Sequence, residues 1–419
     1  MNGKKMTNNE IGQILKKEKN SMARKRAWLA GKQVGALVAA DVIELAHLRN
    51  AGAQKLGFAN FHAMALAASE QNVDELDKIF ADLEELTAAP FANLKSELDA
   101  LLADAYGIGV SELMPWHYHD LFFQEPPLVS SIDLDSYYAD HNIVELAKQF
   151  YAGLDMDVES ILENSDLYER ENKNPHAFCT DIDREGDVRI LCNIENNERW
   201  METLLHELGH AVYDKYQDPA LPFILREPAS AFTTEAIAMF FGRLSCNADW
   251  MQRMLDLDDS ARDRIAQVSG KHIQLKQLIF ARWAMVMYHF EKQLYQDPDQ
   301  DLNGLWWQLV ERFQMVRKPT ERDEPDWAAK IHVALYPAYY HNYMLGELFA
   351  SQLHHYIVHN ILNSDSDDGV SYIDQVKVGN YLKEKVFRPG KSAPWSAMIA
   401  NATSEPLTAA YFVQQFVNR

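Results

Sequence analysis

The sequence predicts a mainly α protein: a single α-rich domain, bilobed around a deep cleft, that carries one small β-hairpin. From about Glu10 to Ala105, and again over the C-terminal half, apolar residues recur at three- and four-residue spacing, the pattern of amphipathic helices. One stretch, His176 to Ile194, is instead rich in β-prone residues around a central turn. We therefore expect residues 1–419 to form one domain that begins with a polar N-terminal segment at 1–23.

The expected elements follow one another in a simple order. The first helical region has breaks near Gly57 and Pro90, because glycine and proline interrupt helices. Helical periodicity resumes from Asp133 to about Glu163, and the hairpin then turns at Glu185-Gly186. The remaining irregular segments are an aromatic connection at Pro115–Pro127 and breaks near Pro219–Pro222, Pro298, Pro319–Pro325 and Asn363–Gly369.

Composition excludes several classes of partner. The formal net charge of −21 would repel nucleic acid and anionic membrane surfaces, so neither is an expected partner. The same charge is explained by a solvated surface, or by steering of cationic peptides toward a negative cleft. The sequence does not decide the oligomeric state.

Cysteine usage and the N-terminus indicate a cytoplasmic location. The three cysteines, Cys179, Cys192 and Cys246, are sparse and irregularly spaced, which fits a reducing compartment and excludes a metal site built from cysteine. The first 20 residues are basic and polar with no apolar stretch behind them, unlike a secretory signal. No uninterrupted apolar run reaches the length of a membrane span.

The chemistry begins with the segment His206-Glu207-Leu208-Gly209-His210, inside an expected helix from Glu198 to Tyr216. Residues four apart on a helix project from one face, so both imidazoles can bind one tetrahedral zinc ion. Glu207 lies on the same side and can act as general base toward a water molecule without being a ligand. So short a pattern arises by chance in a modest share of proteins, but the apolar helical face around it favours a buried metal site.

A catalytic zinc site needs a third protein ligand and one open position. Glu235 begins a second, strongly apolar helix, where a buried carboxylate is costly unless a cation pairs with it. As a residue of the first helical turn it could instead favour the helix dipole. Glu227, in the preceding loop, is the competing ligand, although it more naturally supports the site.

Hydrolysis also needs groups that stabilise an oxyanion. The segment from Lys330 to Gln352 concentrates such donors around one proline. Aromatic clusters of this kind usually belong to a core, so composition alone leaves their role open. The candidate donors are Lys330, His332, Tyr339, Tyr340, His341 and Tyr343.

Four segments, in order, resemble those of the angiotensin-converting-enzyme-like peptidyl-dipeptidases, a gluzincin family related to the thimet and oligoendopeptidase metallopeptidases. They are HAFCTDIDREGDVRILCNI, HELGH, ILREPASAFTTEAI and KIHVALYPAYYHNY. The resemblance runs from about residue 24 to the end and implies that the family's first lid helices are largely absent from this sequence. It also implies a helical, deep-channel fold with one Zn²⁺ per chain.

The resemblance assigns roles to individual residues. It implies that Glu235 is the third zinc ligand and that His332 and Tyr343 stabilise the oxyanion. It implies further that Lys330 and Tyr340 bind the C-terminal carboxylate of the substrate, and that His176 contacts the substrate.

The expected function is zinc-dependent hydrolysis of short peptides, with release of C-terminal dipeptides favoured. Cleavage of internal bonds by an oligopeptidase is the alternative within this class. A catalytically silent peptide-binding scaffold is the alternative from another class, and the intact Glu207 argues against it.

Overall fold

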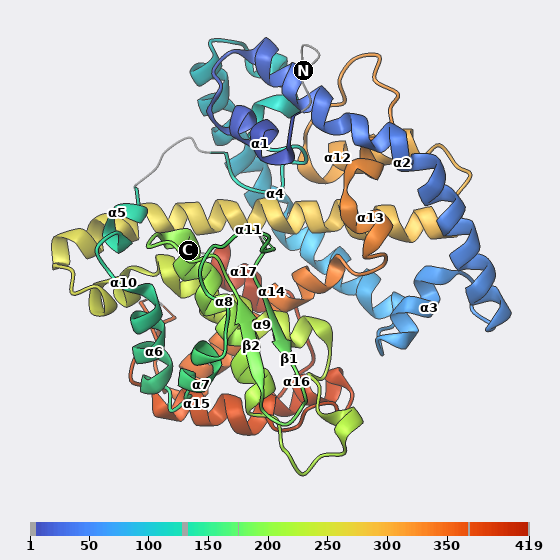
Figure 1. The fold of residues 1–419 in the computed structure, drawn as a ribbon. Helices are drawn as coiled ribbons and strands as arrows, with labels where there is room; N and C mark the ends of the chain where they lie inside the picture. The colour runs from blue at the N-terminus through green and yellow to red at the C-terminus, as the bar shows by residue number, and fades with distance from the viewer. Residues whose placement is uncertain (1–5, 128–132, 175, 368, 418–419) are drawn as a thin grey trace. The chain divides into compact units, whose positions relative to one another are not determined.

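The computed structural model describes residues 6–127, 133–174, 176–367 and 369–417 (Figure 1). Over these residues the chain is mainly helical, with one two-stranded antiparallel sheet, which confirms the predicted fold class. No helix in the described ranges is both long and apolar enough to cross a membrane. The deep cleft and the single-domain organisation stay predictions.

The chain divides into two compact units. Unit 1 comprises residues 1–131 and 272–344, and unit 2 comprises residues 132–271 and 345–419. Two helices, α11 (Asp259–Gln296) and α14 (His341–Tyr356), contain residues of both units, so the chain passes between the units within helices.

Unit 1 is built from long helices. Its own elements are α1 (Asn8–Lys17), α2 (Ser21–Lys55), α3 (Phe61–Ala68), α4 (Val73–Tyr106), α12 (Leu302–Gln314) and α13 (Ile331–Leu335), with short 3₁₀ turns at Val110–Glu112, Pro115–His117 and Asp326–Ala329.

The predicted polar N-terminal segment is partly structured. Helix α1 begins with a capping box in which the Thr7 hydroxyl accepts from the Glu10 backbone N–H and the Glu10 carboxylate accepts from the Thr7 backbone N–H. Ile11 and Leu15 are buried on one face of this helix. The polar N-terminal segment thus contains an amphipathic helix with a defined first residue.

The predicted breaks at Gly57 and Pro90 have different outcomes. Helix α2 ends at Lys55, and Gly57 follows with φ of 88°, a left-handed conformation that favours glycine. The predicted break at Pro90 is wrong, because Pro90 lies inside α4, which is one continuous helix of 34 residues. Proline removes one hydrogen bond of the helix, but Leu83 and Phe91 are buried on either side, and this packing stabilises the continuous helix.

Unit 2 has shorter helices and the sheet. Its own elements are α5 (Asp135–Tyr138), α6 (Ile143–Gly153), α7 (Glu159–Glu163), β1 (Phe178–Asp181), β2 (Val188–Leu191), α8 (Glu198–Lys215), α9 (Ala231–Gly242), α10 (Ala248–Met254), α15 (Val376–Leu382), α16 (Trp395–Thr403) and α17 (Ala410–Phe416), with 3₁₀ turns at Phe223–Leu225 and Arg243–Cys246 and π-helical turns at Ile357–Ile361 (η6) and Lys383–Phe387.

The hairpin has the predicted location and turn. Strands β1 and β2 pair antiparallel, with Phe178 opposite Leu191 and Asp181 opposite Val188. Gly186 has φ of 111° in the connecting turn, a conformation that favours glycine. Both strands contact α8, so the hairpin lies against the helix that carries the two histidines (Figure 1).

Candidate metal centre and active site

Helix α8 presents His206 and His210 on one face. The helix starts where predicted, because the side chain of Asn197 accepts a hydrogen bond from the Trp200 backbone N–H and so caps its first turn. The two imidazole rings have centroids 4.9 Å apart and lie nearly perpendicular to each other. The local sequence alone therefore brings two metal-ligand side chains together.

Glycine at position 209 lets α9 approach α8 closely. A Cβ atom at this position would lie 2.7 Å from the Cα atom of Ala238 in α9, closer than real Cβ contacts allow. Glycine is required here for the distance between two backbones, not for a special φ angle. This close packing brings a residue of α9 to the two histidines.

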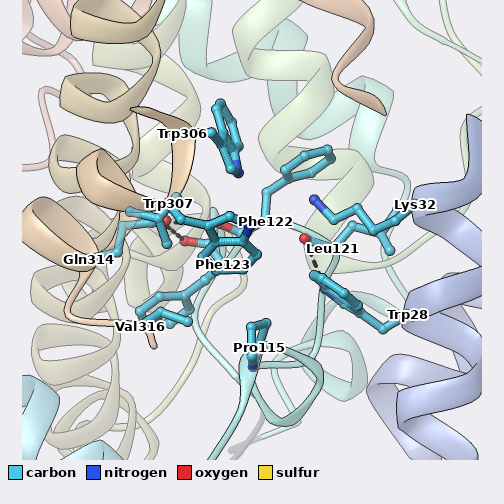
Figure 2. A pocket seen from close by; sticks show the side chains of 11 residues that line it. Trp28, Lys32, Pro115, Leu121, Phe122, Phe123, Trp306, Trp307, Gln314 and Val316 are labelled. Atoms are coloured by element: carbon cyan, nitrogen blue, oxygen red, sulfur yellow. Dashed lines mark hydrogen bonds between the residues drawn. The ribbon is translucent and has the colours of Figure 1, made fainter. Parts of the chain in front are cut away.

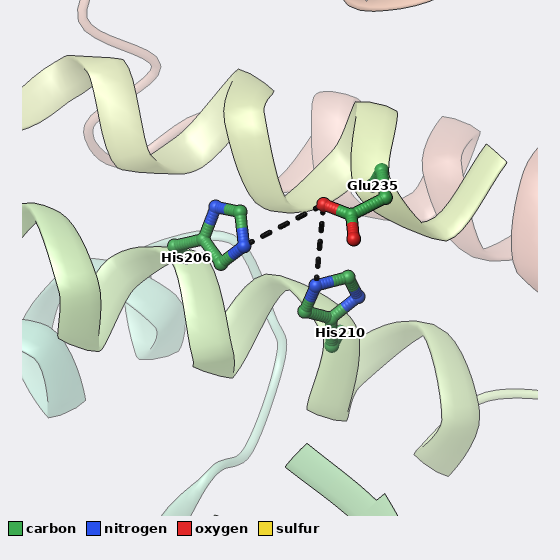
Figure 3. Close-up of side chains that lie close together, drawn as sticks. All are labelled: His206, His210 and Glu235. Atoms are coloured by element: carbon green, nitrogen blue, oxygen red, sulfur yellow. Dashed lines mark ion pairs between the residues drawn. The ribbon is translucent and has the colours of Figure 1, made fainter. Parts of the chain in front are cut away.

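That residue is Glu235 (Figure 3). Its Oε2 atom lies 3.7 Å from Nε2 of His206 and 3.8 Å from Nε2 of His210. Glu235 was predicted to begin its helix, but α9 begins four residues earlier, at Ala231. The carboxylate therefore lies in the second turn, where an interaction with the helix dipole explains its position less well.

The three side chains fit a divalent metal ion. One ligand atom from each lies within 4.8 Å of the other two, and donors bound tetrahedrally at about 2.1 Å from zinc are roughly 3.4 Å apart. Nδ1 of His210 and the hydroxyl of Thr234 form a hydrogen bond of 2.7 Å, which leaves Nε2 of His210 directed at the cluster. We call His206, His210 and Glu235 the α8–α9 cluster.

Burial shapes the ionisation of this cluster. Burial, and then the charge of Glu347, raise the pKa of Glu235 to about 7. Burial, and then the neighbouring His206, lower the pKa of His210 well below its usual value. A divalent cation favours the anionic carboxylate and the neutral imidazole, which are the forms that ligate metals.

Glu207 lies beside the cluster without belonging to it. Its side chain is buried, and burial followed by the charge of Glu235 raises the pKa of its carboxyl to about 8. A carboxyl group with a raised pKa accepts and returns protons near neutral pH, which a general base in hydrolysis has to do.

Glu227, the competing ligand, lies in other contacts. Its carboxylate forms an ion pair with Arg184 of the hairpin turn and lies 3.6 Å from Nζ of Lys391. The three-ligand grouping that the geometry defines contains Glu235 and not Glu227. Glu227 thus ties the loop before α9 to the hairpin, in the supporting position that the sequence suggested.

His176 lies at the start of the hairpin. Its side chain is exposed, and its backbone N–H donates to Oδ1 of Asn174 at 3.0 Å. One residue separates it from the start of β1 at Phe178. Its predicted contact with substrate stays a prediction.

The four other predicted site residues lie together in unit 1. His332 belongs to α13, and its ring centroid is 4.9 Å from that of Tyr340 and 6.2 Å from that of Tyr343. Burial, and then Lys330, lower the pKa of His332 to about 4. Its imidazole is therefore neutral near pH 7, and a neutral imidazole can donate one hydrogen bond.

Lys330 is a buried cation among aromatic rings. Its Nζ atom donates to Oε1 of Gln124 at 2.7 Å and lies between 5.2 and 5.5 Å from the ring centroids of Phe122, Trp283 and Tyr340. Burial lowers the pKa of Lys330 to about 8. Tyr340 is fixed by Trp283, whose Nε1–H donates to the tyrosine hydroxyl at 2.7 Å.

A second buried lysine that the sequence analysis missed lies near the same aromatic residue. Lys32 lines a small pocket of unit 1, and its Nζ atom is 3.5 Å from the ring centroid of Phe122 (Figure 2). Burial lowers its pKa to about 7. The sequence alone does not mark Lys32 as buried, because lysines in helices usually face solvent.

Two further residues around the cluster were also missed. Thr234 was overlooked because threonine is common near helix starts, although its place directly before Glu235 was a usable signal. Glu347 raises the pKa of Glu235 and pairs with Arg243 at 2.7 Å. It lies over a hundred residues from Glu235, and only the packing of α14 on α9 relates the two.

The profile of peptidase family M3 matches residues 14–418. The chain belongs to peptidase family M3. This is a family of metallopeptidases, most of which use zinc, so the metal-ligand grouping and the family agree. The family includes the thimet and oligopeptidase-like enzymes that the sequence resembles.

Two curated proteins are distant relatives. Over 275 residues the chain is 23% identical to "Carboxypeptidase 1" of Bacillus subtilis, covering 60% of this chain and 53% of that protein. Over 263 residues it is 24% identical to "Thermostable carboxypeptidase 1" of Pyrococcus furiosus, covering 57% and 51%. The chain thus spans about half the length of the curated relatives it matches.

Proposed function

We propose that this chain is a zinc-dependent peptidase that shortens peptides from the C-terminus, releasing dipeptides. The α8–α9 cluster, with Glu207 one residue after the first histidine, is the observation that carries this proposal. Membership of peptidase family M3 supports it.

The chemistry divides between the metal and the side chains. Zinc, when bound, supplies a Lewis acid that polarises the scissile carbonyl and makes a water molecule more acidic. Glu207 takes the proton from the attacking water and returns it to the leaving amine. Thr234 holds the His210 ring in the orientation that directs Nε2 at the cluster.

The residues of unit 1 take the roles that the resemblance implies. His332 and Tyr343 donate hydrogen bonds to the oxyanion, and the neutral state of His332 suits a donor that is not itself ionised. Lys330 and Tyr340 bind the free carboxylate of the peptide. His176, which belongs to unit 2, contacts the substrate. A lysine among aromatic rings is poorly hydrated, which strengthens its attraction for a carboxylate.

The names of the two relatives support action at the C-terminus. Both are called carboxypeptidases, and a carboxypeptidase recognises the free carboxylate that Lys330 would bind. Cleavage of internal bonds is the alternative, and it requires no such recognition.

A matched pair of peptides, one with a free C-terminal acid and one with an amide, decides between these modes. Product masses should show dipeptides from the free acid, with turnover of the amide reduced more than roughly tenfold, because a buried charge pair is worth about 2–5 kcal/mol. Equal cleavage of both peptides at internal bonds would contradict C-terminal recognition. Release of single residues from the free acid would show that the product is one residue and not a dipeptide. Recognition of the C-terminal carboxylate would still hold.

The Lys330→Met variant should remove that discrimination by weakening only the free-acid substrate. His332→Ala should instead lower turnover of both peptides alike, since it serves the chemistry. With a pKa near 8, Lys330 loses its charge as pH rises through that value. The KM of the free acid should therefore rise above pH 8 in the wild type and stay flat in Lys330→Met.

Removal of zinc tests the proposal as a whole. A chelator should abolish cleavage of both peptides, and added Zn²⁺ should restore it. A protein that binds zinc and peptide but cleaves neither peptide would be the silent scaffold instead.

A further inference from the structure

Unit 2 contains a second group of metal-ligand side chains, which the sequence analysis did not identify. His355 is near the end of α14, His359 is in the π-helical turn η6, and Asp367 is in the loop that follows. One ligand atom from each lies within 4.8 Å of the other two, the same criterion that the α8–α9 cluster meets. We call these three residues the C-terminal cluster.

The distances in this cluster are those of donors arranged around a common point. Nε2 of His359 lies 3.1 Å from Oδ1 of Asp367, and Nδ1 of His355 lies 3.7 Å from Oδ2. The centroids of the two imidazole rings are 4.3 Å apart. The histidines are four residues apart, His355 near the end of α14 and His359 inside the π-helical turn that follows it.

Three polar atoms of the cluster are buried without a hydrogen bond. Nδ1 of His355, Nε2 of His359 and Oδ1 of Asp367 are each inaccessible to solvent, and none makes a hydrogen bond of good geometry within the described residues. They face one another as ion pairs. Burying a polar atom without a hydrogen-bond partner costs free energy of folding, unless another group satisfies that atom. One shared cation would satisfy all three at once.

Residues of α17 hold the cluster in place. The ring of Tyr411 stacks on His355, with centroids 4.3 Å apart. Nε2 of Gln414 donates to Oδ2 of Asp367 at 3.3 Å. The cluster therefore joins three segments of unit 2: the end of α14, the loop at Asp367 and the C-terminal helix.

We propose that His355, His359 and Asp367 form a second metal site, for a divalent transition metal of the zinc type, that ties α17 to the end of α14. Two imidazoles and one carboxylate suit zinc, nickel or cobalt, and they suit calcium or magnesium poorly, since those ions require oxygen donors.

The site is structural and not catalytic. In the α8–α9 cluster the residue after the first histidine is Glu207, whereas after His355 it is Tyr356. The Tyr356 ring stacks on Tyr381 and offers no carboxylate to act as a base. The metal therefore stabilises the fold of the C-terminal segment.

Metal analysis of the purified chain tests this proposal, with Zn²⁺ as the probe. After saturation with Zn²⁺ and removal of the excess, wild type should hold about two zinc ions per chain, one for each three-ligand cluster. The His359→Ala variant should hold about one and keep the wild-type kcat, because the α8–α9 cluster is intact. A wild type with about one zinc ion, unchanged in His359→Ala, would overturn the proposal.

The double variant His206→Ala/His210→Ala separates this proposal from the proposed function. Without the α8–α9 cluster it should still bind about one Zn²⁺ per chain, and its Tm should rise with Zn²⁺ concentration, since a ligand that binds only the folded state stabilises it. Adding His359→Ala should remove both effects. A double variant that binds no zinc while remaining folded by circular dichroism would also overturn the proposal.

Asp367→Asn provides a second test that keeps the size of the side chain. It removes the charge, and zinc affinity at this site should fall at least tenfold, while a histidine–aspartate ion pair without metal would show no zinc dependence. Substitution of Co²⁺ adds a spectroscopic signature: wild type should show absorption from two bound Co²⁺ ions, and Asp367→Asn should lose one part of it. An unchanged spectrum would contradict the assignment of Asp367.

Discussion

The two metal-ligand clusters of unit 2 contain the same types of residue in different structural surroundings. Each has histidines four residues apart on a helix and one carboxylate from another segment. In the α8–α9 cluster the carboxylate comes from a second helix packed closely at Gly209, and Glu207 stands beside it. In the C-terminal cluster the carboxylate comes from a loop, and Tyr356 occupies the corresponding place. The spacing of two histidines thus indicates metal binding, and the neighbouring residue decides whether hydrolysis can follow.

The strongest test of this difference replaces the residue that follows the first histidine of each cluster. Glu207→Gln should lower kcat by about 10²–10⁴-fold, because the amide keeps the shape of the side chain and loses the base. Metal content should stay unchanged. The matched variant Tyr356→Phe should leave kcat at the wild-type value. A Glu207→Gln protein with nearly normal kcat would show that another group activates the water.

Glu235, the assigned zinc ligand, and Glu227, the competing candidate, should differ in how their replacement affects zinc binding. Glu235→Ala should lower zinc affinity at the α8–α9 cluster by more than the roughly 10–100-fold that loss of a supporting residue causes, and should abolish turnover. Glu227→Ala is the control, because its carboxylate pairs with Arg184 and Lys391, and its zinc affinity should be normal. Isothermal titration with Zn²⁺ measures both. Equal losses in the two variants would contradict the choice of Glu235.

Loss of the hydrogen bond between His210 and Thr234 should have a smaller effect on zinc binding. Thr234→Val removes the hydroxyl and should weaken zinc binding about 10–100-fold, because the imidazole loses its orientation. Thr234→Ser restores the hydroxyl and should rescue the affinity. Failure of serine to rescue would indicate that the methyl group of threonine, through packing, is what matters.

The close approach of α8 and α9 is tested through the stability of the fold. Gly209→Ala places a Cβ atom against the backbone of Ala238, and such overpacking costs about 1–3 kcal/mol of unfolding free energy. Gly52→Ala in α2 has no atom within 4 Å of the added Cβ and should instead stabilise by up to roughly 1 kcal/mol. Urea unfolding of the two variants measures the contrast. A neutral Gly209→Ala would show that the helices can separate without cost.

Several features of this molecule were determined by the sequence itself because they depend on local interactions. The spacing of His206 and His210, the cap at Asn197 and the turn at Gly186 involve residues close together in the chain. Helix periodicity and turn chemistry act over such distances, so the sequence alone predicted α8 and the hairpin at the correct places.

Other features were decided only by tertiary structure, because they depend on residues distant in the chain. Pro90 lies within an unbroken helix since buried neighbours compensate for its missing hydrogen bond. Glu235, and not Glu227, joins the histidines because Gly209 lets α9 approach α8. Asp367 meets His355 and His359 only through the path of a loop. Helical and turn preferences set each segment, but packing decides which segments meet, and a site that needs three of them becomes visible only in the folded chain.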